Sequence, residues 1–426
     1  MLTDRREKMN NPRVLFSTVT ADILRGKNRL NEKVFDTTSS YQSWTAMNRP
    51  LYQLRVTNPP FGLRFIKENI KGVDTLEYPG WEDYLAALKK GYDIVGISFF
   101  TWTFQDALKM AEIAREYGVK EVWGGNYGVM TPGAEKYFDK VFPGNCESYL
   151  KRELEGKELS ALKHPVMIGK ARWSLFGENI GYLYTRRGCN AKCTFCPTPW
   201  FTSEDESHDI SGIEEVLDHY KKVAASPVII YDETFLSGGK RTEAIIEELA
   251  RRNLRWVCLT RADRIAGKVS GLKKKGLHSA IIGVESIHDE NLSFVSKKEK
   301  IESIKDVIRE LNENGCFPDG TYMLGFPNDT AASIREDIEI LASWDFFLVQ
   351  FTILTPFPGT PLWEQLKDKI TDSDWSHFDS YHLVWDHPHF TPQGLRDTLY
   401  QALRRVNRPS NYLRKMLGYY VKSRIA

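Results

Sequence analysis

Residues 187–197 read Arg187-Gly-Cys-Asn-Ala-Lys-Cys-Thr-Phe-Cys-Pro197, which places Cys189, Cys193 and Cys196 in a C-x3-C-x2-C run. Three thiolates at this spacing can hold an iron-sulfur cube and leave its fourth corner without a local ligand. A cluster with an open iron is suited to chemistry at that iron, whereas a fully ligated cluster is suited to electron transfer. The other cysteines, at positions 146, 258 and 316, stand singly and predict no second cluster.

Two other interpretations of the cysteine run are less favoured. A structural zinc site needs four ligands, usually two close pairs, and the sequence has no second pair at ligand spacing. A disulfide framework is disfavoured because the three cysteines stand too close together and nothing marks the chain as secreted. No apolar stretch approaches the roughly 18 residues that span a bilayer, and the start of the chain is charged. We therefore expect a cytoplasmic protein in a reducing compartment, with no membrane partner.

Length and charge limit the kinds of partner. The chain has 426 residues, enough for two domains of ordinary size. Its 58 basic residues nearly balance its 56 acidic residues, so no excess of charge predicts a nucleic-acid groove. A small-molecule substrate fits this composition better than a polyanionic partner.

The run Cys189-x3-Cys193-x2-Cys196, with Phe195 before its last cysteine, resembles the signature of the radical S-adenosylmethionine (SAM) superfamily. The resemblance implies a 4Fe-4S cluster whose open iron binds the amino and carboxylate groups of SAM. It also implies reductive cleavage of SAM to a 5′-deoxyadenosyl radical. The electron would come from an external donor such as flavodoxin or ferredoxin.

The first 150 residues alternate strand-like and helix-like segments, the pattern of a parallel sheet covered by helices. A capping box at Thr103 and Asp106 and a stop at Gly118 bound the clearest helix. In doubly wound sheets ligands bind beyond the carboxyl ends of the strands, here the loops that start at Ser98 and at Gly124-Gly125. The expected strands are Arg13 to Ser17, Asp93 to Ser98 and Val119 to Gly125.

This first segment resembles the cobalamin-binding domain that precedes the radical domain in one class of the superfamily. The similar stretches are Ser98-Phe-Phe-Thr-Trp102, Gly124-Gly125 and Asn58 to Leu63. The resemblance implies cobalamin contacts from Ser98, Trp102, Gly124 and Gly125, and corrin packing by Phe16 to Leu24, Phe99 and Phe100.

The segment also departs from that class. The Asp-x-His-x-x-Gly loop of the class is absent, and no histidine precedes His164, so this segment offers cobalt no imidazole. The alternative interpretation of its glycines and aromatic residues is a tight strand end and ordinary core packing.

A βα rhythm recurs from residue 179 to 370, after an expected linker at 151–178. Six strand-like segments alternate with helix-patterned ones such as Arg241 to Arg251, which suits a partial (βα)6 barrel. In barrel folds the chemistry lies at the carboxyl ends of the strands, and the cysteine run follows the first of these six strands. The expected strands are Gly181 to Thr185, Val228 to Tyr231, Trp256 to Leu259, Ser279 to Val284, Thr321 to Leu324 and Phe347 to Leu354.

Polar groups follow these strands in the order that the radical SAM domain has them. Asp232 and Glu233 follow the second strand, where the resemblance implies acceptors for the amino group of SAM; solvation or helix capping is the alternative. The resemblance places Arg261, which follows the third strand, where the family contacts the substrate carboxylate or the ribose, and a guanidinium there would serve as a planar fork. Glu285 and Ser286 follow the fourth strand, as candidates for the ribose hydroxyls or the amino group. A buried glutamate there would be costly without such a partner.

Glycine and proline shape the last two strand ends. Leu324-Gly-Phe-Pro327 and Thr355-Pro-Phe-Pro-Gly-Thr-Pro361 resemble the turns that lie against the adenine, although turn chemistry alone also explains them. We expect residues 371–426 to close the barrel mouth and touch the substrate. The histidines of this tail favour surface or core positions over a metal site, since no carboxylate or cysteine is fixed near them in the sequence.

The sequence thus predicts an α/β protein with a doubly wound, Rossmann-like cobalamin-binding-type domain (1–150), a linker (151–178), a partial (βα)6 radical SAM barrel (179–370) and a short α-rich extension (371–426). The expected activity is hydrogen abstraction from a small molecule, for cobalamin-dependent C-methylation. The nearest alternative is a cobalamin-free radical SAM dehydratase, epimerase or rearrangement enzyme, and a different class is a cluster-carrying electron-transfer protein. No catalytic residue is assigned.

Overall fold

The structure is a computed structural model that describes residues 11–20, 59–170, 179–201, 210–408, 410 and 414–415. It divides into two compact units, one with residues 11–20 and 60–163 and the other with those from His164 onward. The domain boundaries expected at 150 and 178 stay predictions. Asn58 and residues 21–24, which were expected near cobalamin, lie outside the described part of the chain. No helix in that part is long and apolar enough to cross a bilayer.

The first unit is built on a parallel five-stranded sheet with the order β2-β1-β3-β4-β5. The two central strands β1 and β3 have apolar sequences because both of their faces are covered. The chain runs outward from β1 to β2 and then crosses to β3, so the topological switch point lies between β1 and β3. This order is that of a doubly wound sheet, as predicted. The strands are β1 Val14–Thr18, β2 Val73–Leu76, β3 Ile94–Ser98, β4 Glu121–Gly125 and β5 Lys140–Phe142.

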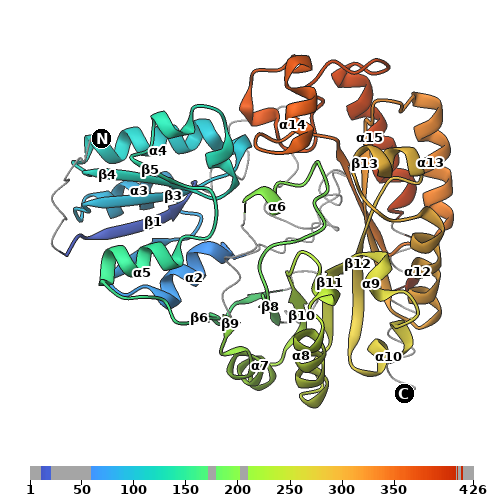
Figure 1. Cartoon of the computed structure of the whole chain (residues 1–426), viewed down its shortest axis with the longest axis horizontal. Coiled ribbons are helices and arrows are strands. Elements are labelled where there is room, and N and C mark those ends of the chain that lie inside the picture. The colour runs from blue at the N-terminus through green and yellow to red at the C-terminus, as the bar shows by residue number, and fades with distance from the viewer. Residues whose placement is uncertain are drawn as a thin grey trace. The chain divides into compact units, whose positions relative to one another are not determined.

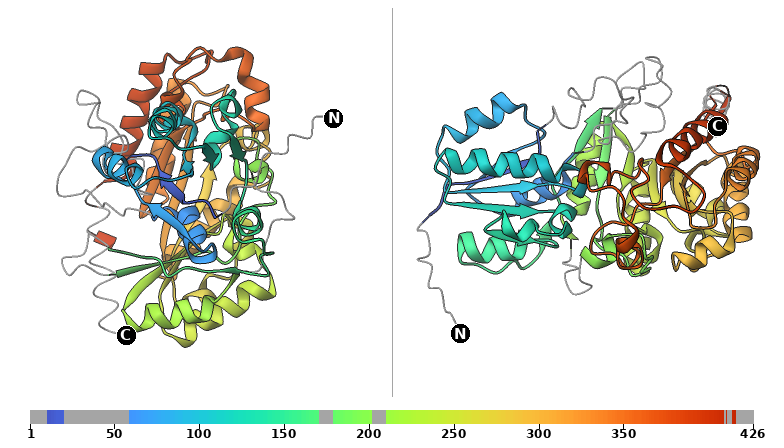
Figure 2. Two further views of the ribbon diagram at one scale, coloured as in Figure 1. Left: turned by 90° about the vertical axis from the view of Figure 1, so that its left-hand side faces the viewer. Right: turned by 90° about the horizontal axis from the view of Figure 1, so that it is seen from above.

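Helices cover both faces of this sheet (Figures 1 and 2). One face packs α2 and α5 against Phe16, Ile94 and Trp123 in one apolar cluster. On the other face Tyr84 of α3 donates its hydroxyl hydrogen to Met110 O of α4 at 3.0 Å. The helices are α2 Phe61–Asn69, α3 Trp81–Leu88, α4 Phe104–Glu116 and α5 Glu147–Glu155.

One local prediction for this unit is wrong, one is confirmed, and two strands were not predicted. The capping box at Thr103 is wrong, because the hydroxyl of Thr103 accepts from Phe100 N–H at 3.0 Å and makes no cap bond to α4. The stop at Gly118 is confirmed, with φ of +84°. Strands β2 and β5 were missed because they are short edge strands whose residues are mostly half-buried and therefore lack an apolar run.

The second unit contains a seven-stranded sheet with the order β14-β13-β12-β11-β10-β8-β7. The six strands from β8 to β14 are parallel and follow one another in chain order, which confirms the partial barrel. Strand β7 pairs antiparallel with β8 and was not predicted. The strands of this sheet are β7 Ile168–Lys170, β8 Asn179–Leu183, β10 Ala225–Ile230, β11 Trp256–Thr260, β12 Leu277–Glu285, β13 Phe317–Leu324 and β14 Leu348–Ile353. Two further strands have two residues each: β9 Ile210–Ser211 in this unit and β6 Leu162–Lys163 at the end of the first unit.

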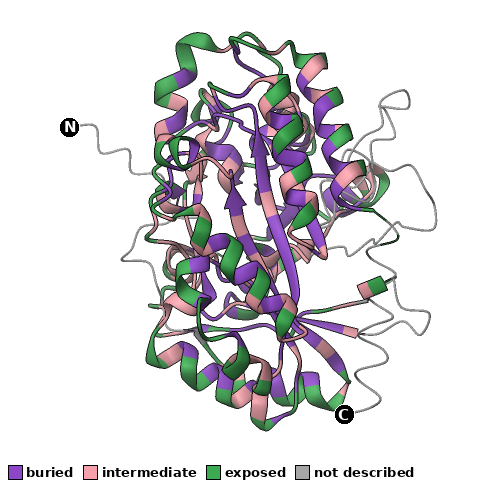
Figure 3. Cartoon of the chain, turned by 90° about the vertical axis from the view of Figure 1, so that its right-hand side faces the viewer, coloured by how far each residue is buried: buried purple, intermediate pink, exposed green. Residues whose placement is uncertain are grey.

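Amphipathic helices pack on the outer face of this sheet, with the strands buried beneath them (Figure 3). Helix α12 shows the pattern, since its buried residues Ile304, Val307, Ile308 and Leu311 recur at helical spacing. The helices are α6 Thr198–Phe201, α7 Ile213–Lys222, α8 Lys240–Arg251, α9 Ala262–Ile265, α10 Val269–Lys274, α11 Asp289–Phe294, α12 Ile301–Glu313, α13 Ala331–Ser343, α14 Pro361–Leu366 and α15 Pro392–Val406.

The segment after α14 belongs to the core of the second unit. Trp385 and Tyr381 are buried in the same apolar cluster as the barrel strands. The amide of Asn407 bonds both backbone groups of Val349, at 2.9 Å and 2.8 Å, so the end of α15 satisfies the free edge of β14. Covering of the barrel mouth and contact with substrate stay predictions for this segment.

Candidate active site

The cysteine run forms a loop directly after β8, at the carboxyl end of the barrel strands. Thr194 N–H donates to Val295 O at 3.0 Å, at the end of α11. Leu362 N–H, in α14, donates to Thr194 O at 3.0 Å. Gly188, with φ of +84°, allows the turn into the loop. Contacts from distant parts of the barrel therefore fix the second half of the loop.

The three cysteines form no disulfide. Cys193 is buried, and Cys189 and Cys196 are half-buried. Burial raises the pKa of the Cys193 thiol, while the positive charges of Lys297 and Arg261 act in the opposite direction. Burial raises the pKa of Cys196 to about 12. Among the described residues no three His, Cys, Asp or Glu side chains converge on one metal ion. In a cubane each thiolate binds a different iron, so the thiols need not converge on one point.

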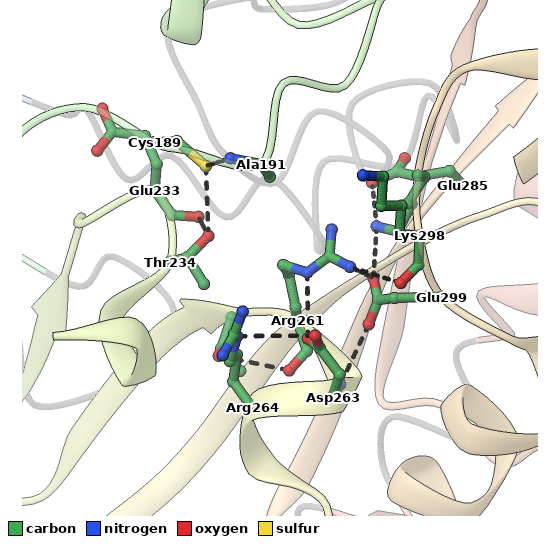
Figure 4. Close-up of polar contacts among 12 residues, drawn as sticks. Cys189, Ala191, Glu233, Thr234, Arg261, Asp263, Arg264, Glu285, Lys298 and Glu299 are labelled. Atoms are coloured by element: carbon green, nitrogen blue, oxygen red, sulfur yellow. Dashed lines mark hydrogen bonds and ion pairs between the residues drawn. The ribbon is translucent and has the colours of Figure 1, made fainter. Parts of the chain in front are cut away.

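Asp232 and Glu233, at the end of β10, have different surroundings. Asp232 is 2% exposed and its Oδ1 accepts from Thr185 N–H at 2.6 Å, while its Oδ2 accepts from the Thr185 hydroxyl. Glu233 Oε2 is buried and has no hydrogen-bond partner. Burial raises the pKa of Asp232 to about 6, and burial with the charge of Asp232 raises that of Glu233 to about 7. Glu233 and Thr234 lie beside Cys189, whose Sγ is 3.8 Å from Thr234 Oγ1 (Figure 4).

Glu285 ends β12 in an unusual backbone conformation. Its φ is +63°, and the register of β12 against β13 shifts between Gly283 and Glu285, as in a β-bulge. Its buried carboxylate accepts from Thr321 Oγ1 at 3.1 Å and from Lys297 Nζ at 3.4 Å. Lys297 is also 3.3 Å from Glu299 Oε2. Burial opposes the charge of Lys297, yet the two carboxylates together raise its pKa above the usual value.

Arg261 follows β11 and joins the same network. Its Nε donates to Asp263 Oδ1 at 3.1 Å, and its Nη2 donates to Lys298 O at 3.1 Å and lies 3.5 Å from Glu299. The network thus brings Arg261 and Glu285 to one side of the barrel mouth, with Cys189 on the other side and the Glu233 carboxylate pointing away from Arg261 (Figure 4).

Ser286 and Phe195 serve the packing of the site. Ser286 is fully buried, and its Oγ accepts from His288 N–H and Asn291 Nδ2, both at 3.1 Å, which fixes the turn after β12. Phe195 is half-buried and packs on the barrel core. Asp329 accepts from Gly325 N–H at 2.9 Å and Phe326 N–H at 3.0 Å, and so shapes the turn after β13.

Sequence reasoning missed several groups in this site. Thr185, Lys297, Glu299 and Thr321 contact the predicted residues but lie in no recognisable motif. A weak signal existed for Lys297 and Glu299, because the buried Glu285 required a nearby cation. The pairing of Asp232 with Thr185 joins residues 47 positions apart and required the strand order.

The carboxyl ends of β3 and β4, beside the switch point of the first unit, carry the residues predicted to bind cobalamin. Ser98 lies opposite Gly125 in the β3–β4 register. Asn126 Nδ2 donates to Ser98 Oγ at 3.3 Å, and Asn126 has φ of +72° and ψ of −177°, a region that favours glycine. A Cβ on Gly125 would meet open space, whereas one on Gly124 would lie 3.0 Å from Phe138. Gly124 therefore serves packing, and Gly125 leaves this strand end open.

An aromatic stack lies next to this strand end. Phe100, which is 42% exposed, stacks with Trp102 and with Tyr127, each at 6.3 Å between ring centroids. Phe99, by contrast, is buried in the core against Phe104 and Phe138.

The tail histidines have carboxylate partners, which corrects the expectation that none was fixed nearby. His377 Nδ1 is 2.7 Å from Asp372 Oδ2, and His382 Nδ1 is 3.0 Å from Asp379 Oδ1. The two imidazole rings stack at 4.4 Å. In the described residues these groups still form no site for a metal ion.

Comparison with known proteins agrees with this geometry. Residues 183–341, from the end of β8 into α13, match the sequence profile of the Radical SAM superfamily. Residues 183–341 of this chain therefore form a radical SAM domain. The protein is a radical SAM enzyme, and the 4Fe-4S cluster and SAM are the cofactors that the superfamily implies.

Curated relatives and a solved structure extend the match over both units. An uncharacterised methyltransferase of Pyrococcus horikoshii is 26% identical over 81% of this chain and 87% of that protein. The bacteriochlorophyllide d C-12(1)-methyltransferase of Chlorobaculum tepidum is 24% identical over 77% of each chain. The radical SAM methyltransferase TsrM of Kitasatospora setae, solved with cobalamin and a 4Fe-4S cluster, aligns with a TM-score of 0.63 over 92% of this chain and 91% of its own, at 13% identity. That structure shares the fold.

The residues present fit the radical SAM cofactors. One loop offers three reduced thiols, and Lys297 and Arg261 place positive charge near the buried Cys193. Glu233 Oε2 is buried without a hydrogen-bond partner and can accept a hydrogen bond from a cationic ligand group.

Proposed function

We propose that this protein is a cobalamin-dependent radical SAM methyltransferase that acts on a small molecule. The observation that carries the proposal is a barrel with a three-cysteine loop joined in one chain to a sheet of order 2-1-3-4-5. In such sheets a ligand binds at the switch point between β1 and β3. Two curated relatives named as methyltransferases support the proposal, as does the shared fold with TsrM.

Cys189, Cys193 and Cys196 would hold the 4Fe-4S cluster. Bound together, the cluster and SAM supply a 5′-deoxyadenosyl radical, a chemistry that belongs to the cofactors. The chain's task is to hold SAM in one orientation and keep the site closed to side reactions. The buried side chains around the loop serve that task.

Glu233, Arg261 and Glu285 would bind the polar groups of SAM. Glu233 has a buried oxygen without a partner, which suits the amino group. Arg261 presents a guanidinium whose orientation is fixed by Asp263 and Glu299, which suits a carboxylate or the ribose. Glu285 is held by Thr321 and Lys297 and suits the ribose hydroxyls.

Cobalamin would bind at the switch point of the first unit, where it supplies a methyl group. Ser98, Gly125 and Asn126 line the open strand end, and the Phe100, Trp102 and Tyr127 stack offers an apolar surface for the corrin. No histidine precedes His164 in the sequence, so this unit would leave the lower face of cobalt without an imidazole.

Counting products tests this proposal. With reductant and substrate, methyl transfer yields S-adenosylhomocysteine together with 5′-deoxyadenosine, and the holoprotein should contain cobalt after growth with cobalamin. Cobalt-free protein that forms 5′-deoxyadenosine alone would favour the radical SAM dehydratase, epimerase or rearrangement enzyme instead. The proposal includes an external electron donor and a small-molecule substrate. Candidate small molecules can be screened for the substrate by measuring S-adenosylhomocysteine and 5′-deoxyadenosine.

A further inference from the structure

We propose that Asp232 is a positioning residue that clamps the start of the cysteine loop, and that Glu233 alone remains to accept the amino group of SAM. The inference rests on the proposed use of SAM. The resemblance implied one role, acceptance of the amino group, for both neighbouring carboxylates.

Both oxygens of Asp232 are occupied by the first residues of the loop. Oδ1 accepts from Thr185 N–H at 2.6 Å, and Oδ2 accepts from the Thr185 hydroxyl. The Arg186 backbone adds a further hydrogen bond to the same carboxylate. Asp232 and Thr185 are 2% and 3% exposed, so water does not compete with these bonds. An incoming ammonium would have to displace them.

The clamp ties two neighbouring strands together at their carboxyl ends. Asp232 follows β10, Thr185 follows β8, and the two strands are paired in parallel. Thr185 lies shortly before Cys189, with Gly188, whose φ is +84°, between them. The Thr194 contacts described above hold the far half of the loop, beyond Cys193. The Asp232 clamp therefore holds the near half, which carries Cys189.

Contacts of Thr234 with this near half are longer. Arg186 Nη2 donates to Thr234 O at 3.4 Å, and Cys189 Sγ is 3.8 Å from Thr234 Oγ1. The short Asp232 bonds are therefore the main restraint on the position of Cys189 relative to β10.

Glu233 has the opposite character. Its Oε2 is buried and has no hydrogen-bond partner. A buried carboxylate oxygen without a partner is costly, and a ligand that brings its own N–H donors would satisfy it. The residue that follows it, Thr234, contacts Cys189, while the Glu233 carboxylate points away from the Cys189 sulfur (Figure 4).

Asparagine at position 232 separates the two roles. Its Oδ1 accepts from Thr185 N–H, and its Nδ2 donates to the Thr185 hydroxyl, which both donates and accepts. The clamp therefore survives in Asp232→Asn, whereas the charge that attracts an ammonium is lost. Alanine at the same position removes the clamp as well.

The experiment compares Asp232→Asn, Asp232→Ala and Glu233→Gln after anaerobic reconstitution of the full chain. Iron per chain reports the loop, and the affinity for SAM without reductant reports the binding site. Asp232→Asn should keep the iron of the wild type and bind SAM within about threefold of it. Asp232→Ala should lose most of the iron. Glu233→Gln should keep the iron and bind SAM about tenfold or more weakly, as loss of a charged hydrogen bond predicts.

Two results would overturn the inference. Asp232→Asn with a loss of SAM affinity as large as that of Glu233→Gln would make Asp232 an acceptor of the amino group. An iron content in Asp232→Ala equal to that of the wild type would show that Asp232 does not clamp the loop. If Asp232→Ala does not fold, Thr185→Val, which removes one clamp bond, is compared with Thr185→Ser, which keeps it; equal iron in both would also contradict the clamp.

A measurement on metal-free protein keeps the clamp separate from the proposed function. Amide hydrogen exchange across residues 185–193 should be faster in Asp232→Ala than in the wild type and unchanged in Asp232→Asn. This readout does not need SAM or iron. Wild-type protein that binds neither would contradict the proposed function while the exchange result still tests the clamp.

Discussion

Gly283 leaves the space that the ion pair of Glu285 and Lys297 occupies. A Cβ at this position would lie 2.6 Å from Glu285 Oε1 and 2.7 Å from Lys297 Nζ. Both groups are ends of side chains, so the barrel can fold with a methyl group there, but the ion pair must move. The position of the ion pair therefore requires a glycine here, whereas the fold of strand β12 does not.

Gly283→Ala should weaken SAM binding about tenfold without loss of iron, since displacement of a charge-assisted hydrogen bond has an effect of this size. Calorimetric titration of the reconstituted protein with SAM measures it. Gly271→Ala is the matched control, because a Cβ there meets nothing within 4 Å on exposed helix α10. Equal affinities of Gly283→Ala and Gly271→Ala would contradict this account of Gly283.

Lys297 is the cation that makes two buried carboxylates tolerable. Its Nζ lies 3.4 Å from Glu285 and 3.3 Å from Glu299, and its side chain is 5% exposed. Lys297→Met keeps the apolar stem and removes the charge, so the free energy of unfolding should fall by about 3 kcal/mol, as for other broken buried ion pairs.

Urea denaturation of the metal-free chain measures this change. Lys298→Met is the matched control, because Lys298 is the exposed neighbour and its contact with Arg261 uses the backbone oxygen. Its effect should stay within about 0.5 kcal/mol. A similar small effect for Lys297→Met would show that the carboxylates do not need the cation.

At the scale of elements, strand β13 carries a buried carboxyl in the barrel. Asp319 Oδ2 accepts from Ser279 Oγ at 2.8 Å, and Asp319 Oδ1 has no partner. Burial raises the pKa of Asp319 to about 7. The folded chain then holds the proton more tightly than the unfolded chain, in which the pKa of aspartate is about 3.9. This contribution to stability is complete below about pH 4, is lost as the pH rises to about 7, and stays lost above it.

Asp319→Asn removes the ionisation and should therefore stabilise the protein more at pH 8 than at pH 5. About three pKa units at 1.36 kcal/mol each give a gain of up to about 4 kcal/mol at pH 8, and less than half of that at pH 5. Urea denaturation at both pH values measures the difference. A gain that does not change with pH would contradict the raised pKa.

Strands with apolar runs were predictable from the sequence, and short strands of mixed sequence were not. The six parallel barrel strands and β1, β3 and β4 carry apolar runs that burial on both faces requires. Strands β2, β5 and β7 lie at sheet edges and are only three or four residues long, with mixed sequences such as Val-Asp-Thr-Leu in β2. Pairing with a neighbour, which the local sequence does not encode, decides whether such segments become strands.

At the scale of the whole molecule, the order of strand-end residues was predictable, but their contacts were not. The order Cys189, Asp232, Arg261 and Glu285 follows from the βα rhythm, because parallel strands bring their carboxyl ends to one edge. The contacts of Asp232 with Thr185 and of Lys297 with Glu285 depend on side-chain directions that are set only after folding. The register shift of β12 at Glu285 likewise could not be predicted from the local sequence.

The cysteine loop is the part on which the account depends, so the most direct measurement is SAM cleavage by the anaerobically reconstituted chain. The wild type should bind about four irons and form 5′-deoxyadenosine when reductant is added. Cys193→Ala, which removes the buried thiolate, should form none, while Cys258→Ala, a buried cysteine in β11, should retain the activity if it folds. Wild-type protein that carries its cluster but leaves SAM intact under reduction, or Cys193→Ala that still cleaves SAM, would contradict the account.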